Sequence, residues 1–209
     1  MRCSVGEFSK ITAILRGYDC DQVDAVIHVL VNSPISAVEI TLNREDSIEM
    51  IARMIQKYSG KIAIGAGTVL SEEDLEAVVK AGVDFVLSPN VFTKEMLAFC
   101  HQHEVISVPG AFSPTEVYQS LQEGADIVKI FPARTLGSGY FKDLQAPYGK
   151  LPLMAVGGIN AGNIREYFQA GASFVGIASG LFNKEDVLRK NMDGMKASLE
   201  AFQAQIEGI

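Results

Sequence analysis

Several features that would indicate other classes of protein are missing from this 209-residue sequence. Its three cysteines, Cys3, Cys20 and Cys100, contain no CxxC pair and are odd in number, so we expect free thiols and a reducing compartment. The longest apolar runs are far shorter than a membrane-spanning helix, and residues 1–7 lack the apolar core of a signal peptide. We therefore expect a cytoplasmic protein without membrane attachment.

Linkers and charge blocks are also absent. No proline-, glycine- or serine-rich stretch, low-complexity tract or run of like charge divides the chain, so we expect a single domain over residues 1–209. With 48% hydrophobic residues, that domain can bury a substantial core. The net charge of −7 argues against nucleic acid as the main partner, although a local basic pocket could hold a small anion.

Metal ligands are scarce. Cys100, His101 and His103 form the only group in the sequence that resembles a metal-binding cluster, and it closes an expected helix. Residues two apart do not share a helix face, so the two histidine rings should point apart. We expect no metal and no other cofactor.

A loose repeat is the main evidence for the fold. Residues 80–87, 122–129 and 169–176 each end a helical pattern at a glycine and enter a β-rich run about three residues later. Reading outward from them gives eight expected strands, at 11–16, 37–41, 61–68, 85–89, 105–109, 127–131, 152–157 and 174–178. Apolar strands alternating with amphipathic helices predict an α/β fold, a (β/α)8 barrel with a short N-terminal helix. An open, doubly wound sheet is the alternative.

Helix starts are marked by capping residues. Ser71, Thr93 and Ser113 each precede an acidic first turn, which suits the N-terminus of a helix. A final helix is expected over residues 185–206.

Lys129 lies in the apolar run 127–132, where a buried strand is expected. An unpaired ammonium is costly to bury, so a lysine there loses proton affinity and becomes a candidate nucleophile that forms a Schiff base with a carbonyl substrate. The alternative is a lysine at a strand end whose head group reaches water.

Glu39 lies in another expected strand, at 37–41. Alternation places Val38 and Ile40 on one face and Glu39 on the other, beside Ala37 and Thr41. Apolar surroundings would raise the carboxyl pKa towards the range useful for proton transfer, and a nearby cation would oppose that shift. The alternative is a buried ion pair with Lys129 or Arg16.

Other polar residues fall at strand ends, which form the active-site face of a barrel. Arg16 offers a fork of donors suited to a carboxylate, and Thr68 offers a hydroxyl beside small neighbours. Gly157 and Gly158 follow the seventh strand and Ser179 follows the eighth, where loops often bind phosphate through backbone N–H groups. Each has a plain alternative, because glycines also serve turns and Arg16 could be a solvated surface charge.

Together these segments resemble the family of 2-keto-3-deoxy-6-phosphogluconate (KDPG) and 4-hydroxy-2-oxoglutarate (KHG) aldolases, which are class I aldolases. The resemblance covers nearly the whole chain. It rests on AILRG at 13–17, VEITL at 38–42, GAGTVL at 65–70, SPN at 88–90, VPG at 108–110, KIFPA at 129–133 and GGI at 157–159, in family order and spacing.

The resemblance implies a role for each candidate residue. Lys129 would form the Schiff base, and Glu39 would act as general acid and base. The other residues would bind the small-molecule substrate: Arg16 and Thr68 its carboxylate, Pro89 and Phe131 as pocket walls, and Gly157, Gly158 and Ser179 its distal phosphate. The family resemblance also implies a homotrimer without a metal cofactor.

One departure from the family pattern affects the substrate. Many relatives place an arginine directly after the Thr-Leu pair of the second strand, where this chain has Asn43 followed by Arg44. Other relatives take the arginine from the end of the first strand, as at Arg16. The Leu42-Asn43 pair resembles the branch that cleaves 2-dehydro-3-deoxy-6-phosphogalactonate (KDPGal), so substrate preference stays open.

Two other functions use the same barrel. A phosphosugar isomerase or epimerase could use Glu39 as base without a lysine nucleophile, and a non-catalytic barrel could bind a sugar phosphate without turnover. A metal-dependent aldolase is disfavoured because a ligand cluster is missing from the sequence.

Overall fold

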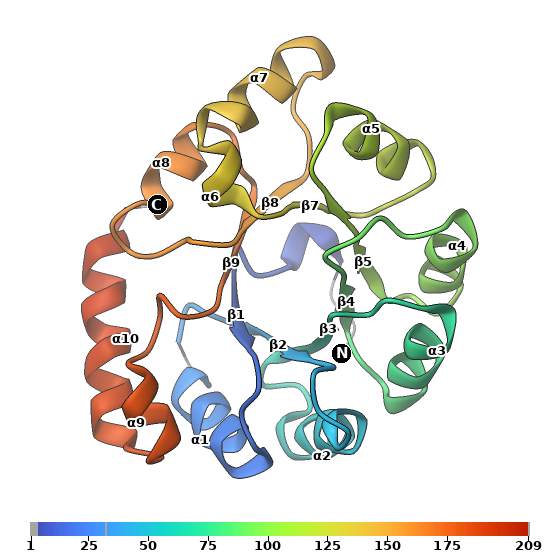
Figure 1. Ribbon diagram of the computed structural model, residues 1–209. Coiled ribbons are helices and arrows are strands. Elements are labelled where there is room, and N and C mark those ends of the chain that lie inside the picture. The colour runs from blue at the N-terminus through green and yellow to red at the C-terminus, as the bar shows by residue number, and fades with distance from the viewer. Residues whose placement is uncertain (1–3, 32, 209) are drawn as a thin grey trace.

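The computed structural model describes residues 4–31 and 33–208, and its strands form one parallel sheet arranged as a ring (Figure 1). The strands are β1 (Ile11–Leu15), β2 (Ala37–Thr41), β3 (Ala63–Gly67), β4 (Phe85–Leu87), β5 (Ile106–Val108), β6 (Gly110–Ala111), β7 (Val128–Ile130), β8 (Leu153–Val156) and β9 (Phe174–Ile177). Their order is β5-β4-β3-β2-β1-β9-β8-β7-β6. Because Pro109 alone separates β5 from β6, the ring closes, which confirms the (β/α)8 barrel and rejects the open sheet.

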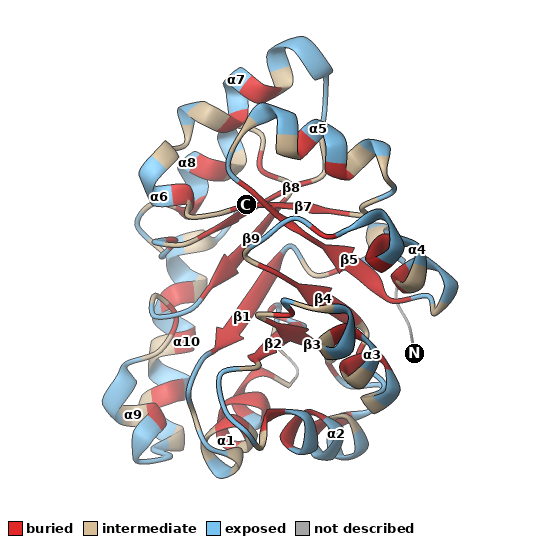
Figure 2. Cartoon of the chain, turned by 45° about the vertical axis from the view of Figure 1, so that its right-hand side comes forward, coloured by how far each residue is buried: buried red, intermediate tan, exposed pale blue. Residues whose placement is uncertain are grey.

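The α-helices surround the ring, and their buried residues face it (Figure 2). They are α1 (Cys20–Leu30), α2 (Ser47–Tyr58), α3 (Glu72–Ala81), α4 (Lys94–Gln102), α5 (Pro114–Gln122), α6 (Ala133–Leu136), α7 (Gly139–Tyr148), α8 (Ile164–Gln169), α9 (Lys184–Leu188) and α10 (Met192–Ile206). The 3-10 helix η1 (Val5–Glu7) instead lies inside the ring in the view of Figure 1. The expected N-terminal helix is a single 3-10 turn, η1. None of the helices in the described residues combines the length and apolar character needed to cross a membrane.

Two expected elements differ in the structure. The strand expected at 105–109 is β5, and a further short strand that was not expected, β6, follows it; the two are separate because the Pro109 nitrogen carries no hydrogen for the ladder. The helix expected at 185–206 becomes α9 and α10. The break occurs where Lys190 adopts a left-handed backbone with φ of 54° and the Asn191 side chain caps α10 by accepting from the Gly194 N–H.

The predicted helix starts are confirmed. The hydroxyls of Ser71, Thr93 and Ser113 accept hydrogen bonds from backbone N–H groups in the first turns of α3, α4 and α5. Ser113 also forms a full capping box, in which the Glu116 carboxylate accepts from the Ser113 N–H at 2.8 Å. These caps fix the ends of the loops that follow β3, β4 and β6.

Two apolar clusters lie on opposite sides of the strands. The larger one packs the strands against the helices, and the smaller one fills the barrel interior. Its members alternate along the strands: Phe8, Ile14, Ala37, Phe85, Leu87, Ile106, Val108, Ile127, Met154, Val156 and Phe174. Phe8 precedes β1 and packs edge-on against Phe85 and Phe174, with ring centroids 5.0 and 5.8 Å apart. The end of the barrel where the strands begin is therefore closed by aromatic rings.

Cys20 and Cys100 carry free thiols. Cys3, for which a free thiol is also expected, lies outside the described residues.

Candidate active site

Glu39 points into the barrel, as alternation along β2 predicts. Its neighbours Val38 and Ile40 pack in the outer cluster, whereas Ala37 belongs to the interior cluster. Glu39 is only 1% exposed, and its Oε2 atom has no hydrogen-bond partner. A buried carboxyl oxygen without a partner is costly, so this group is held for a purpose other than stability.

Lys129 enters the interior from β7. Its backbone N–H donates to the Pro109 carbonyl at 2.8 Å, and the flanking Val128 and Ile130 pack outward. The residue is 3% exposed, which excludes a head group that reaches bulk water. Its Nζ atom lies 4.9 Å from the centre of the Phe131 ring, within the range of a cation–π contact. Lys129 is thus a buried amine beside an aromatic face.

Burial moves the two titrating groups in opposite directions. Desolvation lowers the pKa of Lys129 from its ordinary 10.5, an effect that the Glu39 charge opposes and the Arg16 charge reinforces. Desolvation likewise raises the pKa of Glu39 from 4.5, and Lys129 and Arg16 oppose that shift. The alternative of a buried ion pair is wrong for the described residues, since none of the ion pairs among them includes Glu39. The two groups interact through space inside one low-dielectric interior.

Arg16 and Thr68 follow β1 and β3 at the strand ends. Arg16 is exposed, and its charge acts on both Glu39 and Lys129, so it lies at the mouth of the same interior. Thr68 is half-buried and has a left-handed backbone with φ of 61°. A β-branched residue rarely adopts that conformation, and such strain is concentrated at functional sites.

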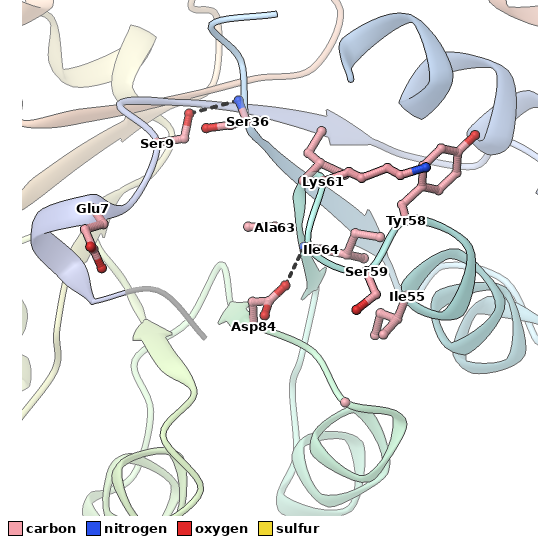
Figure 3. Close-up of a pocket in the computed structure, with 13 residues that line it drawn as sticks. Glu7, Ser9, Ser36, Ile55, Tyr58, Ser59, Lys61, Ala63, Ile64 and Asp84 are labelled. Atoms are coloured by element: carbon pink, nitrogen blue, oxygen red, sulfur yellow. Dashed lines mark hydrogen bonds between the residues drawn. The ribbon is translucent and has the colours of Figure 1, made fainter. Parts of the chain in front are cut away.

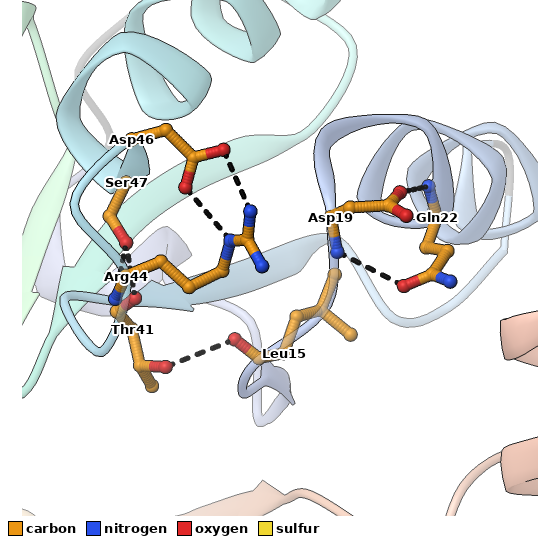
Figure 4. Close-up of polar contacts among 7 residues, drawn as sticks. All are labelled: Leu15, Asp19, Gln22, Thr41, Arg44, Asp46 and Ser47. Carbon is orange, nitrogen blue, oxygen red and sulfur yellow. Dashed lines mark hydrogen bonds and ion pairs between the residues drawn. The ribbon is translucent and has the colours of Figure 1, made fainter.

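Arg44 is occupied elsewhere on the rim (Figure 4). Its Nε and Nη2 atoms donate to the two oxygens of Asp46 at 2.8 and 2.9 Å. Below it, the Thr41 hydroxyl donates to the Leu15 carbonyl at 3.3 Å. The end of β2 is therefore fastened to the end of β1, and the arginine in the loop that follows β2 is paired with a carboxylate of that same loop.

The remaining predicted residues lie at the same end of the barrel. Pro89 follows β4 and Phe131 follows β7, and both are partly buried. Gly157 and Gly158 follow β8 with φ of 99° and 85°, and Ser179 is exposed after β9. A Cβ on Gly180, next to Ser179, would lie 2.5 Å from the Ile159 carbonyl oxygen, so the loops after β8 and β9 touch.

Arg134 is a residue that the sequence interpretation missed. A Cβ built on Gly158 would lie 2.7 Å from the Arg134 Cβ and 3.0 Å from its Cδ, so the arginine stem lies against the glycine loop. Its backbone N–H donates to the Gly157 carbonyl at 3.0 Å. Arg134 is exposed and forms none of the ion pairs found in the described part of the chain. The sequence offered one indication that Arg134 lies near the candidate site, namely its position directly after the KIFPA segment at 129–133.

A separate cavity of about 360 Å³ lies at the other end of the barrel (Figure 3). It is lined by η1, by the end of α2 and the turn that follows it, by the start of β3, and by Asp84, whose carboxylate accepts from the Ile64 N–H at 2.9 Å. Glu39 and Lys129 lie within β2 and β7, and the other candidate residues follow the carboxyl-terminal ends of strands, at the end of the barrel opposite this cavity. That face is where barrels of this type hold their chemistry. In the described residues no cluster of His, Cys, Asp or Glu could hold a metal.

Comparison with known proteins gives consistent matches. A family profile described as KDPG and KHG aldolase matches residues 4–198. The 2-dehydro-3-deoxy-6-phosphogalactonate aldolase of Escherichia coli (strain K12) is 29% identical over 198 residues, covering 94% of this chain and 96% of the relative. A probable enzyme of the same name from Rhizobium meliloti (strain 1021) is 31% identical over 173 residues, covering 82% and 81%.

A solved structure matches as well. The crystal structure of KDPG aldolase from Legionella pneumophila, with pyruvate captured as a covalent carbinolamine intermediate, superimposes with a TM-score of 0.84 at 25% identity. The match covers 95% of this chain and 96% of that one. The similarity therefore extends along the whole barrel.

Proposed function

Because the chain belongs to the KDPG and KHG aldolase family, we propose that it is a class I aldolase that cleaves a 2-keto-3-deoxy-6-phospho sugar acid to pyruvate and glyceraldehyde 3-phosphate. The observation that carries the proposal is the burial of Lys129 beside an aromatic ring and within electrostatic reach of Glu39. Burial favours the neutral amine, which is the form that attacks a ketone.

The reaction begins at C2 of the substrate. The lone pair of Lys129 Nζ attacks the ketone carbon, and loss of water gives an iminium ion. The Glu39 carboxylate takes the proton of the C4 hydroxyl, and the electrons of the C3–C4 bond move to the iminium as that bond breaks. The aldehyde leaves as glyceraldehyde 3-phosphate. The remaining enamine is protonated at C3, and water hydrolyses the resulting iminium to pyruvate and the free lysine.

Positioning falls to the residues at the rim. Arg16 and Thr68 bind the substrate carboxylate so that C2 faces Lys129, and Pro89 and Phe131 line the pocket; this lowers the entropic part of the barrier. The distal phosphate binds the loops at Gly157, Gly158 and Ser179. The left-handed backbone at both glycines and the nearby stem of Arg134 support an anion site there.

Substrate preference is testable among three compounds. We propose that KDPGal is preferred, because two relatives that match most of the chain are named for it and the Leu42-Asn43 pair resembles that branch. The direct experiment measures pyruvate release from KDPG, KDPGal and 4-hydroxy-2-oxoglutarate at equal concentrations. Faster release from KDPGal supports the assignment. Faster release from either other compound reassigns the substrate within the family, and no release from all three contradicts aldolase activity and leaves an epimerase or a binding protein.

We also propose that the active form is a single-domain homotrimer located in the cytoplasm. Three large apolar residues, Leu70, Val91 and Phe112, are 46–54% exposed in the loops just after β3, β4 and β6, and exposed apolar residues of this size suit contact between subunits. Light scattering tests the oligomer. The proposal requires a particle of about three times the 22.6 kDa chain mass, and a monomer contradicts it.

A further inference from the structure

Gly67 and Glu39 compete for the same space in the barrel. β2 and β3 are neighbours, with Glu39 paired to Gly65 and Thr41 paired to Gly67. A Cβ built on Gly67 would lie 1.6 Å from Glu39 Oε1, 2.3 Å from Cδ and 2.6 Å from Cγ. The Glu39 carboxyl group therefore occupies the volume that any side chain at position 67 would take.

The glycine at 67 is explained by space and not by backbone conformation. Gly67 is absent from the glycines with positive φ, so an L-residue would meet no backbone strain there. Gly65, two residues earlier in β3, is also absent from the glycines with positive φ. A Cβ built on it would lie 2.4 Å from ring atoms of Phe85. The space left by Gly65 therefore holds the Phe85 ring near the closed end of the barrel, and the space left by Gly67 holds the Glu39 carboxyl group near the open end.

This arrangement determines where the carboxyl group lies. The side chain of Glu39 crosses over β3, so its carboxyl group comes beside the residue that precedes Thr68. Phe85, packed on Phe8, fills the interior on the other side. With a methyl group at position 67, the carboxyl would have to move away from Thr68 and change its distance from Lys129. Because the atoms in conflict belong to a side chain, that movement is compatible with an intact barrel.

We propose that Gly67 is a positioning residue for the acid–base step: it provides the space that sets Glu39 over β3, between the carboxylate-binding Thr68 and the nucleophile Lys129. This inference rests on the proposed aldolase function. A displacement of about 1 Å in a catalytic group can cost about 100-fold in rate. Gly67→Ala should accordingly lower kcat by about 10- to 100-fold and leave KM within about threefold, since the carboxylate- and phosphate-binding groups stay in place.

A double-mutant cycle tests the coupling. The four proteins are the wild type, Gly67→Ala, Glu39→Asp and the double variant. Aspartate is one carbon shorter than glutamate, so Glu39→Asp reduces the overlap with the added methyl group without abolishing it. We expect Gly67→Ala to cost about 10- to 100-fold in kcat when position 39 is glutamate but less than about threefold in the Glu39→Asp background, because sites in contact are not additive. The pH profile of kcat should change in Gly67→Ala and return towards that of Glu39→Asp in the double variant.

Two outcomes overturn the proposal: equal costs of Gly67→Ala in both backgrounds, or wild-type kcat and pH profile in Gly67→Ala. If Gly67→Ala does not fold, the comparison of Glu39→Asp with the double variant decides, since a further loss of about tenfold there contradicts the coupling. Gly176→Ala is the matched control. Its added methyl would meet Ile14 and Val156 at 2.8 and 2.9 Å, so it should lower stability and keep the pH profile of kcat.

Trapping separates this inference from the proposed function. Sodium borohydride with pyruvate should label Lys129 in the wild type and in Gly67→Ala, because the nucleophile is unchanged. A wild type without label overturns the proposed function, and the role of Gly67 with it. A labelled wild type together with an additive cycle overturns the role of Gly67 alone.

Discussion

Lys129 and Glu39 carry opposite charges when ionised, and burial in the same barrel interior favours the neutral form of both. Burial lowers the pKa of the lysine and raises that of the glutamate, and each charge opposes the shift of the other. A free amine and a carboxyl group that exchanges protons are the two reagents that Schiff-base chemistry needs. The same apolar walls therefore prepare both groups.

The mutual effect of these residues predicts a pH shift. The Glu39 charge supports the protonated form of Lys129, so Glu39→Gln should lower the pKa of Lys129 further and keep the amine neutral to lower pH. The midpoint of pyruvate trapping against pH should move to lower pH, whatever the change in its maximal rate. Glu76→Gln, on the exposed side of α3, is the matched control and should leave the midpoint in place. A midpoint that rises in Glu39→Gln would contradict this electrostatic account.

The same burial predicts a cost in stability. Because its pKa is lowered on folding, Lys129 reduces the free energy of unfolding at pH values below 10.5. Glu39, whose pKa is raised, reduces it at pH values above 4.5. Replacing both by apolar residues, Lys129→Met with Glu39→Leu, should raise the free energy of unfolding at pH 7 by about 1–4 kcal/mol. Urea denaturation measures this, and the gain should shrink below pH 4.5 and above pH 10.5. A loss of stability at pH 7 would refute the penalty.

Local patterns predicted single residues well where the cause was local. Alternation along 37–41 was enough to place Glu39 inward, and an apolar run was enough to bury Lys129. The left-handed backbone of Thr68 had no such signal, because a threonine normally avoids it. The approach of Arg134 in α6 to Gly158 in the loop after β8 joins positions 24 apart in the chain, which only the closed barrel brings together.

At the scale of elements, the residues at which helices start were easier to predict from the sequence than those at which helices and strands end. Capping residues act within one turn, so Ser71, Thr93 and Ser113 predicted the starts of their helices. The break between α9 and α10 was missed because the apolar pattern continues across it. Its cause is a cap at Asn191, whose side-chain nitrogen also donates to Asp186 at 2.7 Å. Pro109 carried a visible signal for the break between β5 and β6.

The capping box of α5 gives a stability prediction. Ser113→Ala removes the hydroxyl that accepts from the Glu116 N–H, so the free energy of unfolding should fall by about 1 kcal/mol. Chemical denaturation of the purified variant measures the change. Thr115→Ala, an exposed position in the first turn of the same helix, should change stability by less than about 0.5 kcal/mol. Equal effects at the two positions would mean that the cap contributes nothing specific.

At the scale of the whole molecule, the two ends of the barrel differ in chemistry. Phe8, Phe85 and Phe174 close the end where the strands begin, whereas the opposite end carries the charged residues of the candidate site. The sequence predicted this division through the barrel fold, because the strand ends follow from the order of elements. It did not predict that Phe8, outside any strand, completes the interior core.

This division predicts that stability and activity separate. Phe8 is 5% exposed, so Phe8→Ala should lower the free energy of unfolding by about 3–5 kcal/mol. Its distance from the rim predicts that kcat of the folded protein stays within about twofold of wild type. Leu188→Ala, at a residue that is 40% exposed, is the control and should change neither property appreciably. A large loss of kcat in folded Phe8→Ala would contradict the separation of the two ends.

The most direct measurement treats the protein with pyruvate and sodium borohydride and locates the adduct by peptide mass spectrometry. We expect one reduced pyruvate adduct, on Lys129, and none in a folded Lys129→Met variant, because burial lowers the pKa of Lys129 and so favours the neutral amine that attacks. An unlabelled wild type, or an adduct on another lysine that persists in Lys129→Met, would contradict the Schiff-base role of Lys129.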